Sequence, residues 1–256
     1  MSIKIDNLTY LINNKKIIND ITFDINKGEI LTIIGPNGAG KSTIIKLISG
    51  DIIATTGQIK YNNEDLSKIN IKRRASIRSV MSASKDVIFN YKVRDIIEMA
   101  WIQPFKKENF DFISSLKKIS IECNIESLID RNYLSLSSGE KKRVHLARAL
   151  IQLYGNIEKS KFLILDEPTE NLDLFHEKEI MNLITNKKNE GYGIIIVLHN
   201  INLAYQFSDR ILLLKNGKTI ECNRTKKVMT NTNLVNIYQV PIFVQEDSIN
   251  IKYNNT

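Results

Sequence analysis

The chain is poor in cysteine and has no long apolar run. Its 256 residues include only Cys123 and Cys222, which form no CxxC pair, so neither a disulfide framework nor a zinc site is indicated. The longest apolar run extends from Ile194 to Leu198, whereas a membrane-spanning helix needs about 20 apolar residues. The first residues alternate between polar and apolar and do not resemble a signal peptide. We expect a reducing compartment and no membrane-spanning segment.

Charge of one sign is in modest excess. Lys and Arg number 36 against 28 Asp and Glu, a difference of +8. This surplus suits an anionic ligand, an acidic partner, nucleic acid or an anionic membrane surface. Because the positive charges are spread along the chain, the surplus does not distinguish among these partners. An AT-rich genome that favours Lys, Asn and Ile explains the surplus equally well. The basic run from Lys72 to Arg74 has no interleaved aromatic residues, which argues against a nucleic-acid partner.

Hydrophobic patterning indicates an α/β fold. The composition, 43% hydrophobic and 25% charged, is that of a globular protein of one or two domains. Apolar residues recur at helical spacing over 44–48, and Gly50 is expected to end that helix. The same helical spacing dominates from about 92 to 150. Strands alternate with helices, which predicts a parallel sheet with helices on its faces and an inserted helical segment. The predicted strands cover residues 3–8, 17–25, 30–34, 162–165, 194–198 and 211–214.

A glycine-rich loop follows the strand predicted at 30–34 and opens a helix, which is the context of a phosphate-binding P-loop. Its glycines let backbone N–H groups surround phosphate oxygens, and the helix N-terminus adds a partial positive charge. Lys41 is expected to contact the β- and γ-phosphates, and the hydroxyl of Ser42 to ligate Mg²⁺. The loop reads Gly35-Pro36-Asn37-Gly38-Ala39-Gly40-Lys41-Ser42-Thr43.

Two carboxylates stand at the end of the strand predicted at 162–165. Ligands bind at the carboxyl ends of strands in parallel α/β sheets. We therefore expect Asp166 to hold Mg²⁺ through water and Glu167 to polarise the water that attacks the γ-phosphate. Without the P-loop, a surface acidic pair would be the better interpretation.

With these motifs, the run Leu136-Ser137-Ser138-Gly139-Glu140 resembles the signature motif of ABC transporter ATP-binding subunits. The resemblance implies that two such subunits pack head to tail. Ser137 and Gly139 of one would then contact the γ-phosphate held by the P-loop of the other. A plain helix cap made of the same residues remains compatible with this role.

Two further elements resemble the same family. Asn171-Leu172-Asp173 resembles the D-loop at the dimer interface, with Glu170 in place of the usual small residue and expected to face that interface. His199 follows the strand predicted at 194–198 and resembles the switch histidine that senses the γ-phosphate and orients the water. The other histidines, His145 and His176, are interpreted as helix surface residues.

The resemblance covers nearly the whole chain and implies an α/β P-loop NTPase core with an N-terminal antiparallel β subdomain and an inserted α-helical subdomain. One ABC ATPase domain is expected over 1–256, with the helical subdomain at roughly 84–150. The implied activity is ATP hydrolysis coupled to transport, with ATP and Mg²⁺ as ligands. The implied location is peripheral, on the cytoplasmic face of the cell membrane.

Besides Glu170, two positions depart from the family pattern. Ala83 stands where the family has a glutamine that helps hold Mg²⁺ and the attacking water, and alanine can do neither. We expect this to reduce the rate of catalysis or its coupling to transport, unless Ser82 or Ser84 substitutes for the glutamine. The position that usually stacks on adenine holds Ile12, and Tyr10 lies two residues earlier on the same side of the strand. Both are candidates for the adenine contact.

Details of the second half resemble the importers of iron chelates, cobalamin and haem. A long spacer at 151–160 resembles that of haem importers, and 199–204, 208–211 and 235–241 match the wider group. The expected partners are a second ATPase copy or a related half, permease subunits, and indirectly an extracytoplasmic solute-binding protein. A groove near Tyr91, Trp101 and Phe105 is predicted to receive a permease helix, unless these aromatics simply belong to the core. A siderophore or cobalamin importer, or a regulatory ATPase without a transport role, remains open.

Overall fold

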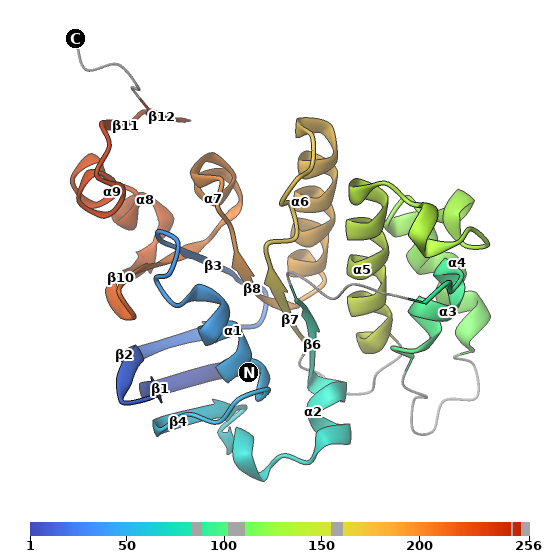
Figure 1. The fold of residues 1–256 in the computed structure, drawn as a ribbon, viewed down its shortest axis with the longest axis horizontal. Coiled ribbons are helices and arrows are strands. Elements are labelled where there is room, and N and C mark those ends of the chain that lie inside the picture. Colours follow the sequence, from blue (N-terminus) through green and yellow to red (C-terminus); the bar gives the residue numbers. More distant parts are fainter. Residues whose placement is uncertain (83–88, 102–110, 155–160, 247, 252–256) are drawn as a thin grey trace.

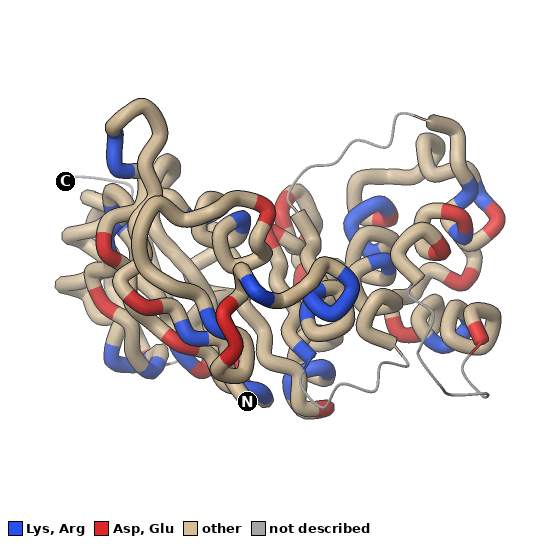
Figure 2. The backbone as a smooth tube through the Cα atoms, turned by 90° about the horizontal axis from the view of Figure 1, so that it is seen from below, with Lys and Arg blue, Asp and Glu red and all other residues tan. Residues whose placement is uncertain are grey.

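A computed structural model describes residues 1–82, 89–101, 111–154, 161–246 and 248–251. Figure 1 shows sheets at the centre and lower left, and helices α3, α4 and α5 grouped to one side. Lys and Arg are interspersed with Asp and Glu over both the α/β and the helical part (Figure 2). No helix in the described part of the chain has the length and apolarity needed to cross a membrane. Both cysteines are free.

The N-terminal segment forms an antiparallel sheet in the order β2-β1-β4-β5. Its strands alternate buried and exposed side chains, as the sequence predicted for 3–8 and 17–25, because one face covers the core. Asn13 and Asn14, at the β1–β2 turn, have left-handed φ angles of 47° and 63°, which asparagine tolerates better than most residues. The strands are β1 (Ser2–Ile12), β2 (Lys15–Asn26), β4 (Thr56–Tyr61) and β5 (Glu64–Asp65).

The central sheet has the order β10-β9-β3-β8-β7-β6. Neighbouring strands from β9 to β6 are parallel, and β10 pairs antiparallel with β9. Strands β3, β7 and β8 are buried along their whole length, which confirms the apolar runs as central strands. Because these three are adjacent and parallel, their carboxyl ends meet at one edge. The strands are β3 (Ile30–Ile34), β6 (Arg78–Met81), β7 (Phe162–Asp166), β8 (Gly193–Val197), β9 (Arg210–Lys215) and β10 (Lys218–Arg224).

Helices cover this sheet and form the insertion between β6 and β7. The insertion contributes α3 (Val93–Glu98), α4 (Phe112–Glu122) and α5 (Ser138–Leu153), whose apolar faces join the same core cluster as β7 and β8. Gly50, with φ 73°, ends α1 as expected. The other helices are α1 (Lys41–Ser49), α2 (Ile71–Ile77), α6 (Leu174–Asn189), α7 (Ile201–Phe207), α8 (Thr225–Val228) and α9 (Asn231–Tyr238). The C-terminal hairpin consists of β11 (Ile242–Val244) and β12 (Ile249–Ile251).

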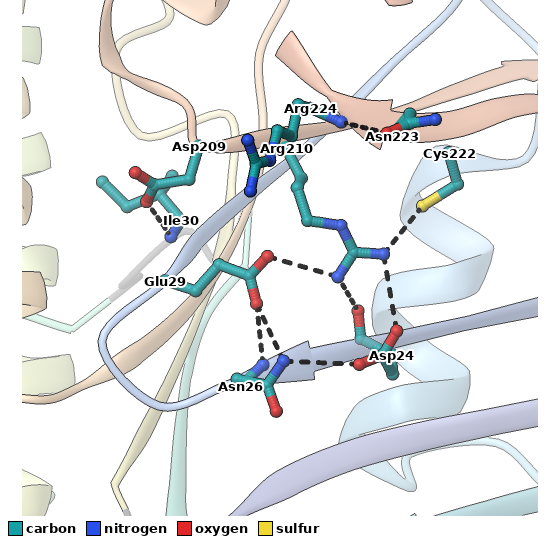
Figure 3. A network of polar contacts seen from close by, with 9 residues as sticks. All are labelled: Asp24, Asn26, Glu29, Ile30, Asp209, Arg210, Cys222, Asn223 and Arg224. Carbon is teal, nitrogen blue, oxygen red and sulfur yellow. Dashed lines mark hydrogen bonds and ion pairs between the residues drawn. The ribbon is translucent and has the colours of Figure 1, made fainter. Parts of the chain in front are cut away.

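A polar network joins the N-terminal sheet to the central sheet (Figure 3). The guanidinium of Arg210 donates to the backbone oxygen of Asp24 at 3.1 Å and to the carboxylate of Glu29 at 3.2 Å. Asp209 accepts from the backbone N–H of Ile30 at 2.8 Å, at the start of β3. Judged from the sequence alone, Asp209 and Arg210 would be a surface pair that contributes little to stability. The structure instead gives them partners that fix the start of the strand leading to the P-loop.

Candidate active site

The loop between β3 and α1 has a backbone that requires glycine. Gly38 and Gly40 have φ angles of 77° and 103°. A Cβ on Gly40 would lie 2.7 Å from the Ile18 side chain, so a larger residue would clash as well as strain the backbone. Gly40 is the N-cap of α1 and supplies no side-chain cap. The N–H groups at this helix start therefore remain available to an anion.

Lys41 is folded back into the loop and is only 6% exposed. Its ammonium donates to the backbone oxygens of Gly35 at 2.8 Å and Pro36 at 3.1 Å. Burial lowers the pKa of Lys41, and the negative charges of Glu167 and Asp166 oppose that change. A phosphate in the loop would offer this cation a stronger partner than the two carbonyl oxygens do.

Ser42 and Asp166 meet where α1 begins and β7 ends. The Ser42 hydroxyl donates to Oδ1 of Asp166 at 3.4 Å, and Asp166 is 5% exposed. Burial raises the pKa of Asp166, while the Ser42 hydrogen bond acts to lower it. A hydroxyl beside a carboxylate is an oxygen donor set suited to Mg²⁺, which usually takes its remaining ligands from water and substrate phosphates. The described residues contain no cluster of three or more His, Cys, Asp or Glu that could hold a metal.

Glu167 and His199 are brought together from the ends of β7 and β8. Nε2 of His199 lies 2.6 Å from Oε1 of Glu167. The Glu167 side chain is 16% exposed and that of His199 45%. Both residues line a pocket of about 200 Å³ that continues along residues 169–171. This arrangement can hold a water against a carboxylate while the imidazole reaches toward solvent or a bound anion.

The D-loop residues lie next to the signature residues of the same chain. A Cβ on Gly139 would stand 3.3 Å from the Leu172 side chain. Asp173 is the N-cap of α6 and accepts from the backbone N–H of His176 at 2.9 Å. The side chain of Glu170 is 45% exposed and lies 3.8 Å from the ammonium of Lys142. This ion pair gives Glu170 a partner within the chain.

Ser137 and Glu140 form a capping box at the start of α5. The Ser137 hydroxyl accepts from the Glu140 N–H at 3.2 Å, and the Glu140 carboxylate accepts from the Ser137 N–H at 2.7 Å. The helix-cap interpretation is therefore correct as local structure. No hydrogen bond in the described part of the chain joins Ser137 or Gly139 to residues 35–43.

The two adenine candidates lie in different surroundings on β1. Tyr10 is half-buried and packs against the N-terminal core cluster. Ile12 is 48% exposed. An exposed apolar side chain is free to cover a planar base, whereas Tyr10 would first have to leave its neighbours. This comparison favours Ile12, and Tyr10 remains a candidate.

His145 is half-buried on α5 and has a partner, so it is not the plain surface residue that the sequence predicted. Its Nε2 lies 2.6 Å from the Tyr133 hydroxyl, and burial lowers its pKa to about 4. The imidazole is therefore neutral at pH 7 and serves as a hydrogen-bonding partner inside the insertion. His176 agrees better with expectation, because it stands in the first turn of α6, where its Nδ1 lies 2.8 Å from the Asp173 carboxylate.

A second pocket, of about 310 Å³, lies between β6, α2, α5 and the turn after α3. Ile71 and Met99, 80% and 59% exposed, stand at its walls beside Ser82. Trp101 packs on Phe112 with ring centroids 5.9 Å apart and belongs to the edge of the core.

Three positions singled out in the sequence, Ala83, Ser84 and Phe105, lie outside the described residues, as do residues 155–160 of the long spacer. The sequence analysis missed Lys142, whose ammonium donates to the backbone oxygen of Glu167 at 2.9 Å. Its only signal was the run of three basic residues, 141–143, directly after the signature.

The chain is similar in sequence to a known family and to known proteins. The ABC transporter family model matches residues 18–170. Hemin import ATP-binding protein HmuV of Pseudoalteromonas translucida is 33% identical over 240 residues, which are 92% of this chain and 91% of that protein. The HmuV protein of Aliivibrio fischeri is 34% identical over 245 residues, 96% of this chain and 93% of its own.

Solved structures show the same fold. An ATP-binding cassette of an ABC transporter matches with a TM-score of 0.81 and 22% identity, covering 92% of this chain and 98% of its own. A metal-chelate type ABC transporter in an inward-facing conformation matches with a TM-score of 0.77 and 24% identity, covering 98% and 95%.

Proposed function

Because this chain belongs to the ABC transporter family and is an ATP-binding subunit whose relatives are ATPases that drive transport, we propose that it energises the import of haem or a related iron chelate through a membrane permease. The observation that carries the chemistry is the meeting of Lys41, Ser42, Asp166, Glu167 and His199 at one sheet edge. The observation that supports the cargo is the likeness to hemin import proteins over nearly the whole chain.

Each side chain at this edge has a proposed task. The P-loop N–H groups and Lys41 bind the phosphates of ATP, and Ser42 and Asp166 hold Mg²⁺ beside them. When bound there, Mg²⁺ would supply positive charge beside the phosphates. Glu167 accepts the proton of the attacking water, and His199 bonds to the Glu167 carboxylate and to the γ-phosphate. Ser137 and Gly139 complete the site of a second ATPase copy, in a homodimer or a heterodimer.

Growth on defined iron sources tests the cargo. Cells supplied with haem as their only iron source are expected to grow with the parent gene and to stop growing when Glu167→Gln replaces it. Growth on a ferric siderophore, and growth that requires imported cobalamin, should continue. Growth loss confined to one of those conditions would assign that cargo instead. No loss under any condition would favour a regulatory ATPase without a transport role.

The pocket beside β6 is the proposed docking site for a cytoplasmic helix of the permease. Exposed apolar side chains at Ile71 and Met99 suit the apolar face of an amphipathic helix. Phe89 and Tyr91 add two more exposed aromatics in the insertion, with ring centroids 6.1 Å apart. This position would hold the subunit at the cytoplasmic face of the membrane as a peripheral protein.

Site-specific crosslinking tests this docking site. In a background where Cys123 and Cys222 are replaced by serine, a cysteine at Asn90 or Met99 is expected to crosslink to the permease. A cysteine at Ile121, on the exposed side of α4 and 54% exposed, serves as the control and should not react. Crosslinks from Ile121 alone would place the permease on another face.

A further inference from the structure

Lys142 reaches from the signature helix to the strand end that carries Glu167. It stands in the second turn of α5, and its ammonium donates to the backbone oxygen of Glu167 at 2.9 Å. The side chain is only 15% exposed. The contact therefore joins the helical insertion to the end of β7 within a single chain.

The backbone at Glu167 needs such support. Its φ angle is 54°, in the left-handed region that residues with a Cβ rarely adopt. The next residue is Pro168, which restricts the residue before it toward extended conformations. The Glu167 N–H donates to Val197 at 3.3 Å, and its carbonyl oxygen accepts from the Glu170 N–H at 3.3 Å. The bond from Lys142 is shorter than either and is the one made by a charged group.

The carboxylate of this same residue lies against His199 at 2.6 Å. A change of backbone angles at Glu167 would swing that carboxylate away from the place where it holds water. We propose that Lys142 is a positioning residue, which keeps Glu167 in its left-handed conformation and so aims the carboxylate at the attacking water. This inference rests on the proposed role of Glu167 as the base. It assigns Lys142 no contact with nucleotide.

The ion pair with Glu170 does not explain why Lys142 is buried. That pair is 3.8 Å long and Glu170 is 45% exposed, so solvent screens most of their attraction. The carbonyl oxygen of Glu167, at 2.9 Å, is the closer partner. The backbone bond is thus the part of the contact expected to matter for catalysis.

The test compares Lys142→Met with a neighbouring control. Lys142→Met keeps the length of the side chain and removes the donor. Its kcat for ATP hydrolysis is expected to fall about tenfold to thirtyfold, since small misplacements of a reacting group cost large factors in rate. The KM for ATP and the Kd for a non-hydrolysable analogue should stay within about twofold. Lys142→Arg, which restores a donor, should recover at least about a third of the parent kcat.

Lys141→Met is the matched control. It removes the same charge one residue earlier, where the ammonium lies over the Tyr133 ring, 5.5 Å from its centroid, and it should hydrolyse ATP at the parent rate. In a Glu167→Gln background, Lys142→Met should change the single-turnover rate by less than about twofold, because no base remains to be placed.

The outcomes distinguish the positioning role of Lys142 from the proposed role of Glu167 as the base. If Lys142→Met matches the parent while Glu167→Gln is slow, the positioning role is wrong and the proposed function stands. An equal loss in Lys141→Met, a loss of nucleotide affinity, or full additivity with Glu167→Gln would make the effect of Lys142 a general structural one and overturn the inference. If Glu167→Gln hydrolyses ATP at the parent rate, Glu167 is not the general base, and the proposed function of this site is wrong.

Discussion

Replacing Glu167 by glutamine is expected to lower kcat for ATP hydrolysis on the order of 10³-fold, within the range of a lost general base. Glutamine keeps the shape of the side chain and can still accept from Nε2 of His199, which lies 2.6 Å from the carboxylate. It cannot take a proton from water at neutral pH. The phosphate contacts come from the P-loop, so the Kd for ATP should change by less than about threefold. Slow hydrolysis with intact binding should also trap the closed, ATP-bound dimer.

Steady-state kinetics and equilibrium nucleotide binding measure this split. Glu170→Gln is the nearby comparison. It removes a carboxylate from the same turn, which pairs weakly with Lys142 and makes no hydrogen bond to His199 in the described part of the chain. Its kcat should fall by less than about threefold if only the Glu167 carboxylate takes the proton. Hydrolysis by Glu167→Gln at the parent rate would show that another group accepts the proton.

Much of this site could be predicted because its chemistry is local in the sequence. The apolar run before Gly35 has to be a buried strand, and the glycines after it permit only a tight loop. Asp166 and Glu167 follow a second run of the same kind. Parallel strands of one sheet bring their carboxyl ends to the same edge, so Ser42 and Asp166 meet there without any contact being known beforehand. His199 follows the third such strand, and its partner Glu167 lies at the end of the strand beside it.

Contacts between distant segments could not be predicted in this way. Arg210 finds Asp24 and Glu29 across more than 180 residues of sequence, and no local pattern marks that pairing. His145 occupies a helix whose sequence is rich in charge, and only the packing of Tyr133 against it shows that it is half-buried. Strand β6, four residues long, was too short to give a clear period of two.

The contact of Lys142 with Glu167 is also one between distant segments that the sequence could not predict, and it bears on function. The neighbours of Lys142, Lys141 and Arg143, carry the same charge, so the sequence alone cannot say which of the three turns inward. The tertiary fold decides, because the second turn of α5 passes the end of β7. Side chains that hold a catalytic group in place are therefore harder to find from sequence than the group itself.

Lys41→Met is expected to raise the Kd for ATP on the order of 10²-fold, since hydrogen bonds to charged groups contribute roughly 1.5–3 kcal/mol and a factor of ten corresponds to about 1.4 kcal/mol. In the structure the ammonium bonds the oxygens of Gly35 and Pro36 inside the loop. Burial lowers its pKa, because the charged form loses solvation there, and an anion beside it would offset that loss. A triphosphate supplies that anion, and methionine cannot respond to it.

The folded state should tolerate the change, because methionine fills the same space and removes a buried charge. We expect the melting temperature of Lys41→Met without nucleotide to equal or exceed that of the parent, and ATP to raise it far less than it raises the parent's. Lys46→Met, at an exposed position in the last turn of the same helix, should bind ATP as the parent does. Parent-like affinity in Lys41→Met would mean that the backbone N–H groups alone hold the phosphates, and that the ammonium serves only to bond the carbonyl oxygens of Gly35 and Pro36.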